Sequence, residues 1–150
     1  MSKEKARFVI KIKRLDPAAQ IPRYEYLSDS GTDIYAVADC TLQPFERKAI
    51  PTGLCAEVLS GFELQIRPRS GLSLESGITV LNTPGTIDSG YRGEIKVILI
   101  NLSSEKYQIK KGQKIAQLVV APVIHANFKE VEELSESERG TRGFGSTDVV

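Results

Sequence analysis

Short apolar segments, separated by closely spaced turn signals, run along most of the chain. Phe8, Ile10 and Ile12 alternate with their neighbours, which predicts a strand with one buried face. The β-branched run at 95–100 predicts a strand buried on both faces, and residues 115–120 predict another strand. Many short strands at this spacing favour a sandwich or barrel over alternating strands and helices. We therefore expect an all-β protein.

The remaining local signals are one short helix and a tail of different composition. Residues 72–75 have helical character, and Gly77 is expected to end that helix. Residues 129–138 hold five glutamates and one lysine, and the glycine-rich stretch that follows has no core-forming pattern. We expect residues 1–138 to form one β domain and residues 139–150 to form a flexible C-terminal segment.

Composition narrows the possible chemistry. The chain has 150 residues, 41% hydrophobic and 26% charged, with a net charge of +1, which is typical of a single soluble domain. Its one histidine, His125, excludes multi-histidine metal sites within one chain, and Cys40 and Cys55 lack the spacing of zinc or thioredoxin-like motifs. The near-neutral charge, the two cysteines and the lack of a membrane-length apolar run predict a cytoplasmic protein without nucleic-acid or membrane partners.

Three segments combine small residues with polar groups, namely 67–73, 82–93 and 139–147. The first joins arginine and serine to the expected helix start, which suits a phosphate, although a tight turn with an N-cap serine explains it too. The second predicts a hairpin with Asp88 and Tyr91 near its mouth, although Asp88 could simply cap a turn. The third places Phe144 between glycines, and a frayed terminus is its simplest explanation. Together the segments suit a phosphorylated aromatic ligand such as a nucleotide.

Five motifs, taken in order, make the chain resemble the homotrimeric deoxyuridine triphosphate nucleotidohydrolases (dUTPases) from about Phe8 to Thr147. They are SGTDIYA at 30–36, PRSGL at 68–72, GTIDSGYRGEI at 85–95, KGQKIAQL at 111–118 and RGTRGFGST at 139–147. The stretch IPTGL at 50–54 also matches the family. Each match is modest evidence alone, whereas five in order at family spacing are specific.

The resemblance implies a jelly-roll-like β fold of the β-clip type, with one short helix, and a tight homotrimer. Each active site would be assembled from all three chains, with residues 139–147 reaching over from a neighbour. The implied reaction is the hydrolysis of dUTP to dUMP and pyrophosphate, which limits uracil incorporation into DNA and supplies dUMP for dTMP synthesis. Mg²⁺ is the implied cofactor, held mainly by substrate phosphates and ordered waters.

The same resemblance implies a role for each site residue. Asp88 matches the general base that activates the attacking water, and Asp33 matches a supporting carboxylate. The substrate-binding residues form three groups: a phosphate cradle of Arg69, Ser70, Gly71 and Gln117; a uracil and deoxyribose pocket of Asn82, Gly85, Thr86, Ile87 and Tyr91; and a closing tail of Arg139, Phe144, Gly145, Ser146 and Thr147. In that tail the ring of Phe144 would stack on uracil while the arginine and hydroxyls hold the terminal phosphate.

Two other functions fit parts of the sequence. The dCTP deaminases resemble dUTPases in fold and third motif, but they place a glutamate in the following strand where this chain has Ile98. A nucleotide-binding module without turnover would have no need of Asp88. The chain departs from the family at Arg142, where a small residue is common, and at Asp148, where glycine is common.

Overall fold

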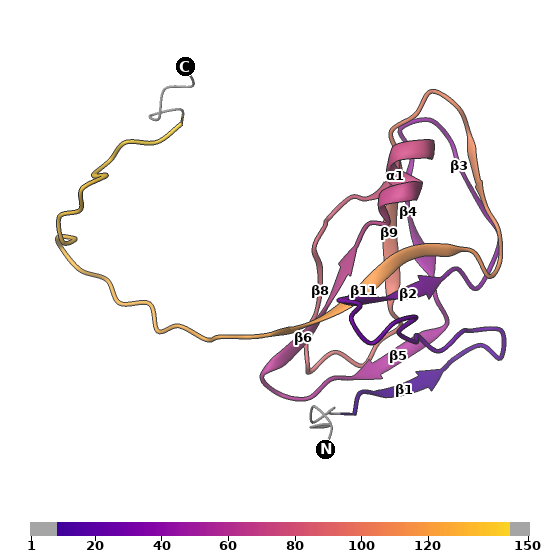
Figure 1. Ribbon diagram of the computed structural model, residues 1–150, viewed down its shortest axis with the longest axis horizontal. Helices are drawn as coiled ribbons and strands as arrows, with labels where there is room; N and C mark the ends of the chain where they lie inside the picture. The colour runs from indigo at the N-terminus through magenta and orange to yellow at the C-terminus, as the bar shows by residue number, and fades with distance from the viewer. Residues whose placement is uncertain (1–8, 145–150) are drawn as a thin grey trace.

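A computed structural model describes residues 9–144 of the protein. Figure 1 shows that β-strands make up the body of the molecule, with a single short helix at one end. In chain order the elements are β1 (Lys11–Arg14), β2 (Gly31–Tyr35), β3 (Cys40–Leu42), β4 (Arg47–Pro51), β5 (Leu54–Glu57), β6 (Phe62–Arg67), α1 (Ser70–Ser76), β7 (Ile78–Val80), β8 (Gly85–Ile87), β9 (Lys96–Asn101), β10 (Tyr107–Ile109) and β11 (Lys114–Pro122).

The strands pair antiparallel in two main sheets and two smaller ladders. One main sheet has the order β2-β11-β6-β8 and the other β4-β9-β7, while β1 pairs with β5 and β3 with β10. Apolar side chains of both main sheets meet in one core, with Ile34, Ile66 and Leu118 from the first and Val97 and Leu99 from the second. The prediction of an all-β fold with one short helix is confirmed. No helix in residues 9–144 has the length and apolar character needed to cross a membrane.

Strand β9 differs from the expectation of burial on both faces. Val97 and Leu99 are completely buried, but Ile98 and Ile100, on the opposite face, are only half-buried. The strand is central in its sheet, paired along 96–100 with β4 and at 99–101 with β7. One side of this sheet packs on the core, and the described part of this single chain leaves the other side incompletely covered.

The helix forms where it was predicted, but it begins earlier. Arg69 occupies the N-cap position with extended backbone and no capping side-chain hydrogen bond, so Ser70 is the first helical residue and not the cap. Gly77 ends the helix in the left-handed conformation, at φ 66°, which glycine adopts without strain. A Cβ at Gly77 would lie 3.2 Å from the backbone nitrogen of Ser103, so close packing also favours glycine there.

The segment 82–93 does not form the predicted hairpin. Its strand β8 pairs with β6, whereas the flanking strands β7 and β9 pair with each other. The segment therefore leaves one main sheet, adds an edge strand to the other and returns. Turn residues mark both ends of this excursion in the sequence, but its pairing partner is a long-range choice that local signals do not specify.

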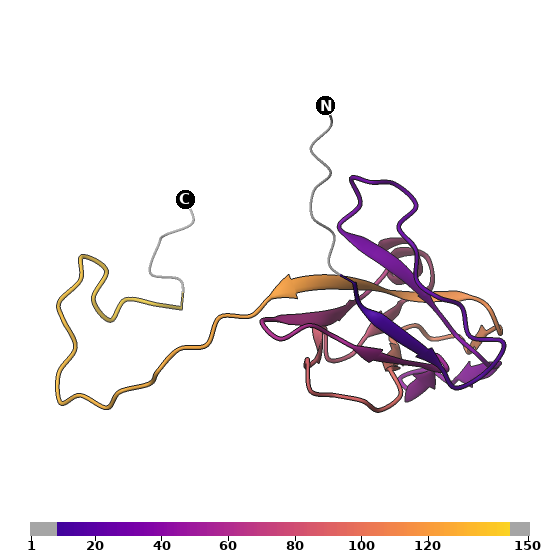
Figure 2. The same cartoon turned by 90° about the horizontal axis from the view of Figure 1, so that it is seen from below.

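After β11 the chain leaves the body of the molecule. Figure 2 shows the orange-to-yellow segment extending away from the sheets. Ile124 and Phe128 are 92% and 98% exposed, and the hydrogen bonds of residues 124–144, within the described range, stay inside that segment. Large apolar side chains in this segment are therefore left in contact with water in the single chain.

A buried asparagine ties the loops around β9 together. The amide nitrogen of Asn101, which is fully buried, donates to the carbonyls of Leu42 (3.2 Å) and Glu105 (2.7 Å). Its amide oxygen accepts from the backbone nitrogen and hydroxyl of Ser103, at 2.9 and 2.8 Å. Because Ser103 packs against Gly77, the Asn101 network also supports the end of α1.

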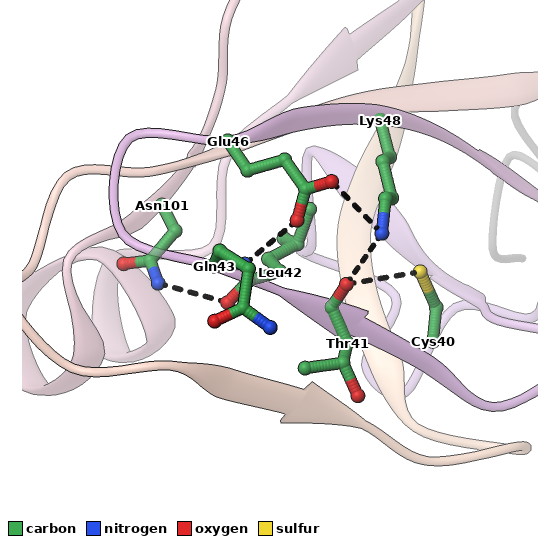
Figure 3. Close-up of polar contacts among 7 residues, drawn as sticks. All are labelled: Cys40, Thr41, Leu42, Gln43, Glu46, Lys48 and Asn101. Carbon is green, nitrogen blue, oxygen red and sulfur yellow. Dashed lines mark hydrogen bonds and ion pairs between the residues drawn. The ribbon is translucent and has the colours of Figure 1, made fainter.

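Figure 3 shows the contact between Asn101 and Leu42 beside a second polar group. In that group the ammonium of Lys48 pairs with Glu46 and donates to the Thr41 carbonyl.

We predict that Asn101→Leu lowers the free energy of unfolding by about 3 kcal/mol, because buried carbonyls and an N–H lose their partners. Chemical denaturation at matched protein concentration measures the change. The control variant Ser103→Ala removes only a hydroxyl at the edge of the network and should cost less than about 1 kcal/mol. Equal stability of Asn101→Leu and the wild type would contradict the assignment.

Candidate active site

A polar hollow of about 230 Å³ opens where β2, β11 and the start of α1 meet. Its lining consists of Asp33, Arg69, Ser70, Gly71 and Gln117. The strand register creates this grouping, because Gln117 on β11 lies directly opposite Asp33 on β2 and opposite Arg67 on β6. The chain then turns after β6 and brings Arg69 and Ser70 to the same place. The sequence-predicted phosphate cradle and its supporting carboxylate are therefore neighbours in the structure.

Asp33 is shared between two cations. Its Oδ1 lies 3.0 Å from Nε of Arg69, and its Oδ2 lies 2.7 Å from Nζ of Lys114. The hydrogen bond to Asp33, followed by the attraction between opposite charges, raises the pKa of the Lys114 ammonium. A raised lysine pKa means that the ion pair persists through neutral pH and is lost only as pH rises through that raised value.

Sequence reasoning missed Lys114 as a member of the site. The residue lies inside the fourth motif, but its side chain reaches Asp33 because the β2–β11 register shifts between Lys114 and Ala116. Such an irregularity inserts one extra residue and redirects a side chain. The only local signal was a lysine in a motif already linked to phosphate binding, and the register shift itself has no signature in the sequence.

Gln117 and Gly71 both line the first hollow, but they differ in how closely the rest of the chain packs around them. The amide nitrogen of Gln117 donates to the Pro68 carbonyl at 2.9 Å, and a Cβ at Gly31 would lie 2.8 Å from its amide oxygen. The side chain is thus fixed between β2 and the loop after β6. A Cβ at Gly71 would instead meet no atom within 4 Å, so the chain's own packing does not require glycine there. That open space allows a ligand to approach the backbone closely.

A second hollow, of about 280 Å³, shares Asp33 and Gln117 with the first. It extends along the loop before β2, and its other lining residues are Arg23, Glu25, Asp29, Ser30, Gly31, Thr32, Tyr35 and Lys114. The carboxylate of Asp29 accepts from the backbone nitrogen of Tyr26 at 2.9 Å, which closes a local turn. The part of this loop before the first motif, residues 23–29, was not singled out in the sequence, because it carries only ordinary turn residues and mixed charges.

The predicted uracil pocket surrounds β8. Gly85 is buried, and a Cβ there would lie 3.3 Å from the amide nitrogen of Asn82 and 3.4 Å from Cβ of Ile66. Asn82 therefore folds closely over Gly85. Ile87 is also buried and belongs to the core, so only its backbone is available to a ligand, whereas Thr86 and Asp88 are exposed.

One chain does not bring Asp88 to the cradle. Gly85 pairs with Ile66 and Ile87 with Leu64, so Asp88 follows the end of β8 that lies beside the start of β6. Arg69 follows the other end of β6, and the six residues of that strand span roughly 17 Å. The candidate base and the candidate phosphate ligands therefore lie at opposite ends of one strand.

The tail residues also lie apart from the cradle. Arg139 and Phe144 are exposed, and Nε of Arg139 donates to the carbonyl of Arg142 within a local turn. Gly145, Ser146 and Thr147 are outside the described residues. Figure 2 shows the described part of this segment well away from the sheets.

The arrangement in the cradle suits an anion with several oxygens. A guanidinium, an amide, a hydroxyl and accessible backbone converge on one hollow, and these are the groups that bind phosphate. Within residues 9–144 no group of three or more His, Cys, Asp or Glu side chains is arranged to hold a metal ion.

Comparison with known proteins agrees with this chemistry. Residues 18–148 match the family model described as dUTPase. The deoxyuridine 5'-triphosphate nucleotidohydrolase of Nautilia profundicola is 58% identical over 138 residues, covering 92% of this chain and 97% of that protein. The enzyme of the same name from Helicobacter hepaticus is 56% identical, covering 94% and 89%.

Solved structures extend the likeness to the fold. The dUTPase of Staphylococcus bacteriophage 80alpha, solved with dUpNHpp, superposes with a TM-score of 0.87 at 29% identity, covering 94% of this chain and 99% of that one. A variant of the same phage enzyme superposes with a TM-score of 0.86 at 28% identity. The predicted jelly-roll-like β-clip fold is confirmed by these neighbours.

We predict that Lys114→Met lowers the affinity for inorganic pyrophosphate about fivefold, because the adjoining hollow loses one positive charge and Asp33 then engages Arg69 more fully. Titration calorimetry at low salt measures the affinity. Lys114→Arg keeps the charge and should bind within about twofold of the wild type, and added salt should shrink the Lys114→Met effect. An unchanged affinity in Lys114→Met would exclude Lys114 from the site.

Proposed function

The chain belongs to the dUTPase family and hydrolyses dUTP to dUMP and pyrophosphate, and we propose that Asp88 activates the attacking water in this reaction. The hydrolysis limits uracil incorporation into DNA and supplies dUMP for dTMP synthesis. The observation that supports the phosphate end of this proposal is the hollow in which Arg69, Ser70, Gly71 and Gln117 converge. In this proposal these groups hold the triphosphate.

Asp88 acts as the general base. Its carboxylate is exposed at the end of β8, and its backbone carbonyl accepts from the nitrogen of Tyr91 at 3.0 Å, which closes the turn on which it stands. The carboxylate orients a water molecule and takes its proton as the oxygen attacks the α-phosphorus. A positioned base contributes about 10²–10⁴-fold, so most of the remaining acceleration comes from positioning and charge stabilisation in the cradle.

The third motif selects the nucleoside. Asn82 and the backbone of Gly85, Thr86 and Ile87 meet uracil with fixed donors and acceptors. Cytosine presents a donor where uracil has an acceptor, so it would leave buried groups unpaired. The close contact between Asn82 and Gly85 supports a rigid pocket. Tyr91 packs under the deoxyribose.

The tail closes the site. Phe144 stacks on uracil, and Arg139 holds the terminal phosphate together with Ser146 and Thr147, next to Gly145. The full exposure of Phe144 in the single chain supports a role outside its own core. A closing segment of this kind excludes water other than the nucleophile.

Mg²⁺ enters with the substrate in this proposal. Phosphate oxygens and water would hold it, because Mg²⁺ commonly keeps waters and leans on substrate oxygens. The groups lining the cradle fit a metal held by the substrate. Hydrogen-bond donors from Arg69, Ser70, Gly71 and Gln117 suit phosphates and not a metal ion. The carboxylate of Asp33 is already paired with two cations. The metal would neutralise charge on the triphosphate, while this chain binds and orients it.

The functional unit is a homotrimer with shared sites. Three observations support it: the separation of Asp88 from Arg69 along β6, the half-buried outer face of β9, and the exposed apolar side chains after β11. A partner chain can supply the missing cradle and cover both apolar surfaces. The cytoplasmic location and the lack of nucleic-acid or membrane partners remain predictions from composition.

The test of the reaction measures pyrophosphate release from dUTP, dCTP, dTTP and UTP with Mg²⁺, by the wild type and Asp88→Asn. We expect the wild type to act on dUTP alone, and Asp88→Asn to keep its nucleotide affinity but lose about 10²–10⁴-fold in turnover.

The same assay distinguishes the alternatives. Ammonia released from dCTP would indicate a deaminase, and dUTP binding without pyrophosphate would indicate a binding module. Wild-type turnover in Asp88→Asn would remove Asp88 from its role as base.

Subunit mixing tests the shared site. Equal amounts of Asp88→Asn and Arg69→Gln chains, each inactive when refolded alone, should recover about a quarter of wild-type activity when refolded together, because one site in four then draws both intact residues from different chains. If mixing restores no activity, the base and the cradle of each site come from the same chain.

A further inference from the structure

The ring of Tyr91 is held in place although it is half exposed. Its hydroxyl donates to the Glu94 carbonyl at 3.0 Å. The ring lies so close to Gly93 that a Cβ there would come within 2.6 Å of its Cζ atom. The guanidinium of Arg92 donates to the carbonyls of Ser89 (2.7 Å) and Tyr91 (3.0 Å), which fixes the backbone on either side. The position of the ring therefore depends on where the Glu94 carbonyl lies.

The turn between β4 and β5 fixes Glu94 and the residue after it. The hydroxyl of Thr52 donates to the Ile95 carbonyl at 2.6 Å, and the nitrogen of Ile95 donates to the Leu54 carbonyl at 2.7 Å. The backbone nitrogen of Gly53 donates to Oε1 of Glu94 at 3.0 Å. Thr52 and Ile95 are each only 1% exposed, so the two bonds of Ile95 lie in the interior, where water does not replace them. The bond from Gly53 to Glu94 is partly buried.

The turn itself has little freedom. Gly53 adopts φ 68°, and a Cβ there would lie 3.0 Å from Cβ of Ala19 and 3.1 Å from Cβ of Asp16. Its carbonyl accepts from the nitrogen of Leu15 at 2.7 Å. The turn is thus packed from the opposite side, and a displacement of Glu94 cannot be absorbed there without breaking close contacts.

We propose that Thr52 and Glu94 are positioning residues that fix the ring of Tyr91 and thereby set the discrimination between deoxyribose and ribose. The inference rests on the proposed function, in which Tyr91 packs under the sugar. A ring excludes a 2′-hydroxyl only while it cannot yield, and a shift of a few tenths of an ångström relieves such a clash. The connection runs from the buried Thr52 hydroxyl to the Ile95 carbonyl and along the backbone to Glu94. The Glu94 carbonyl then accepts from the Tyr91 hydroxyl, while the Gly53 nitrogen holds the Glu94 carboxylate.

The experiment compares kcat/KM for dUTP and for UTP in Thr52→Val and Thr52→Ser. Thr52→Val keeps the shape but removes the hydroxyl, and it should lower the dUTP-to-UTP ratio about tenfold, with kcat/KM for UTP rising. Thr52→Ser restores the hydroxyl and should restore the ratio. A merely structural role would lower both substrates equally or reduce thermal stability alone, and either result would overturn the proposal.

A second variant keeps the test decisive if Thr52→Val does not fold. Tyr91→Phe removes the other end of the connection at an exposed hydroxyl, and we expect the same fall in the ratio. An unchanged ratio in Tyr91→Phe overturns the inference.

Lys96→Met serves as the control. It removes the 3.8 Å ion pair with Glu94 but none of the hydrogen bonds, and it should leave the ratio unchanged. If the wild type released no pyrophosphate from dUTP, the proposed function would fail, whereas failure of the positioning role leaves dUTP hydrolysis intact.

Discussion

The register of β11 between β2 and β6 is the constraint on which the cradle depends. It sets Gln117 opposite Asp33 on one side and opposite Arg67 on the other. Because side chains alternate along a strand, a slip of one residue would turn Gln117 into the core and a buried neighbour toward the ligand. The core prevents this slip, since Ala116 and Leu118, on either side of Gln117, are buried in it. Apolar packing therefore fixes the polar site without touching a ligand.

The same rigid sheet separates the proposed base from the cradle within one chain. Residues on opposite ends of β6 cannot approach each other without breaking the ladder, so Asp88 and Arg69 stay apart in any folded copy. The proposed trimer would resolve this without strain, because the base of one chain could then face the cradle of its neighbour. The surfaces that a trimer would cover, on β9 and after β11, are those at which the single chain leaves apolar side chains exposed.

The sequence predicted some elements of the fold and the site correctly and missed others. The strands at 96–101 and 114–122, the helix and its end at Gly77 follow from periodicity and backbone preference, which are local. The strand expected from Phe8, Ile10 and Ile12 begins only at Lys11, and Phe8 lies outside the described residues. The pairing of β8 with β6 was missed because strand partners are chosen by long-range packing. Lys114 was missed because a register shift aims it at Asp33. The cradle residues were predicted from the motifs. The separation of Asp88 from Arg69 along β6 depends on strand pairing, which the motifs do not specify.

The arrangement around Asp33 also shows why a net charge of +1 says little about phosphate binding. Asp33 pairs with both Arg69 and Lys114, so these three groups together carry one net positive charge, and the carboxylate fixes the guanidinium before a ligand arrives. A long, free arginine would lose rotamer entropy when it bound a phosphate, whereas a guanidinium already oriented by a carboxylate loses less. Because the Asp33 carboxylate competes with a phosphate for the same cations, it lowers the affinity of the cradle for phosphate. In return it holds the Arg69 guanidinium in a fixed orientation. That exchange suits a site whose reaction depends on the direction of attack at phosphorus more than on the tightness of binding.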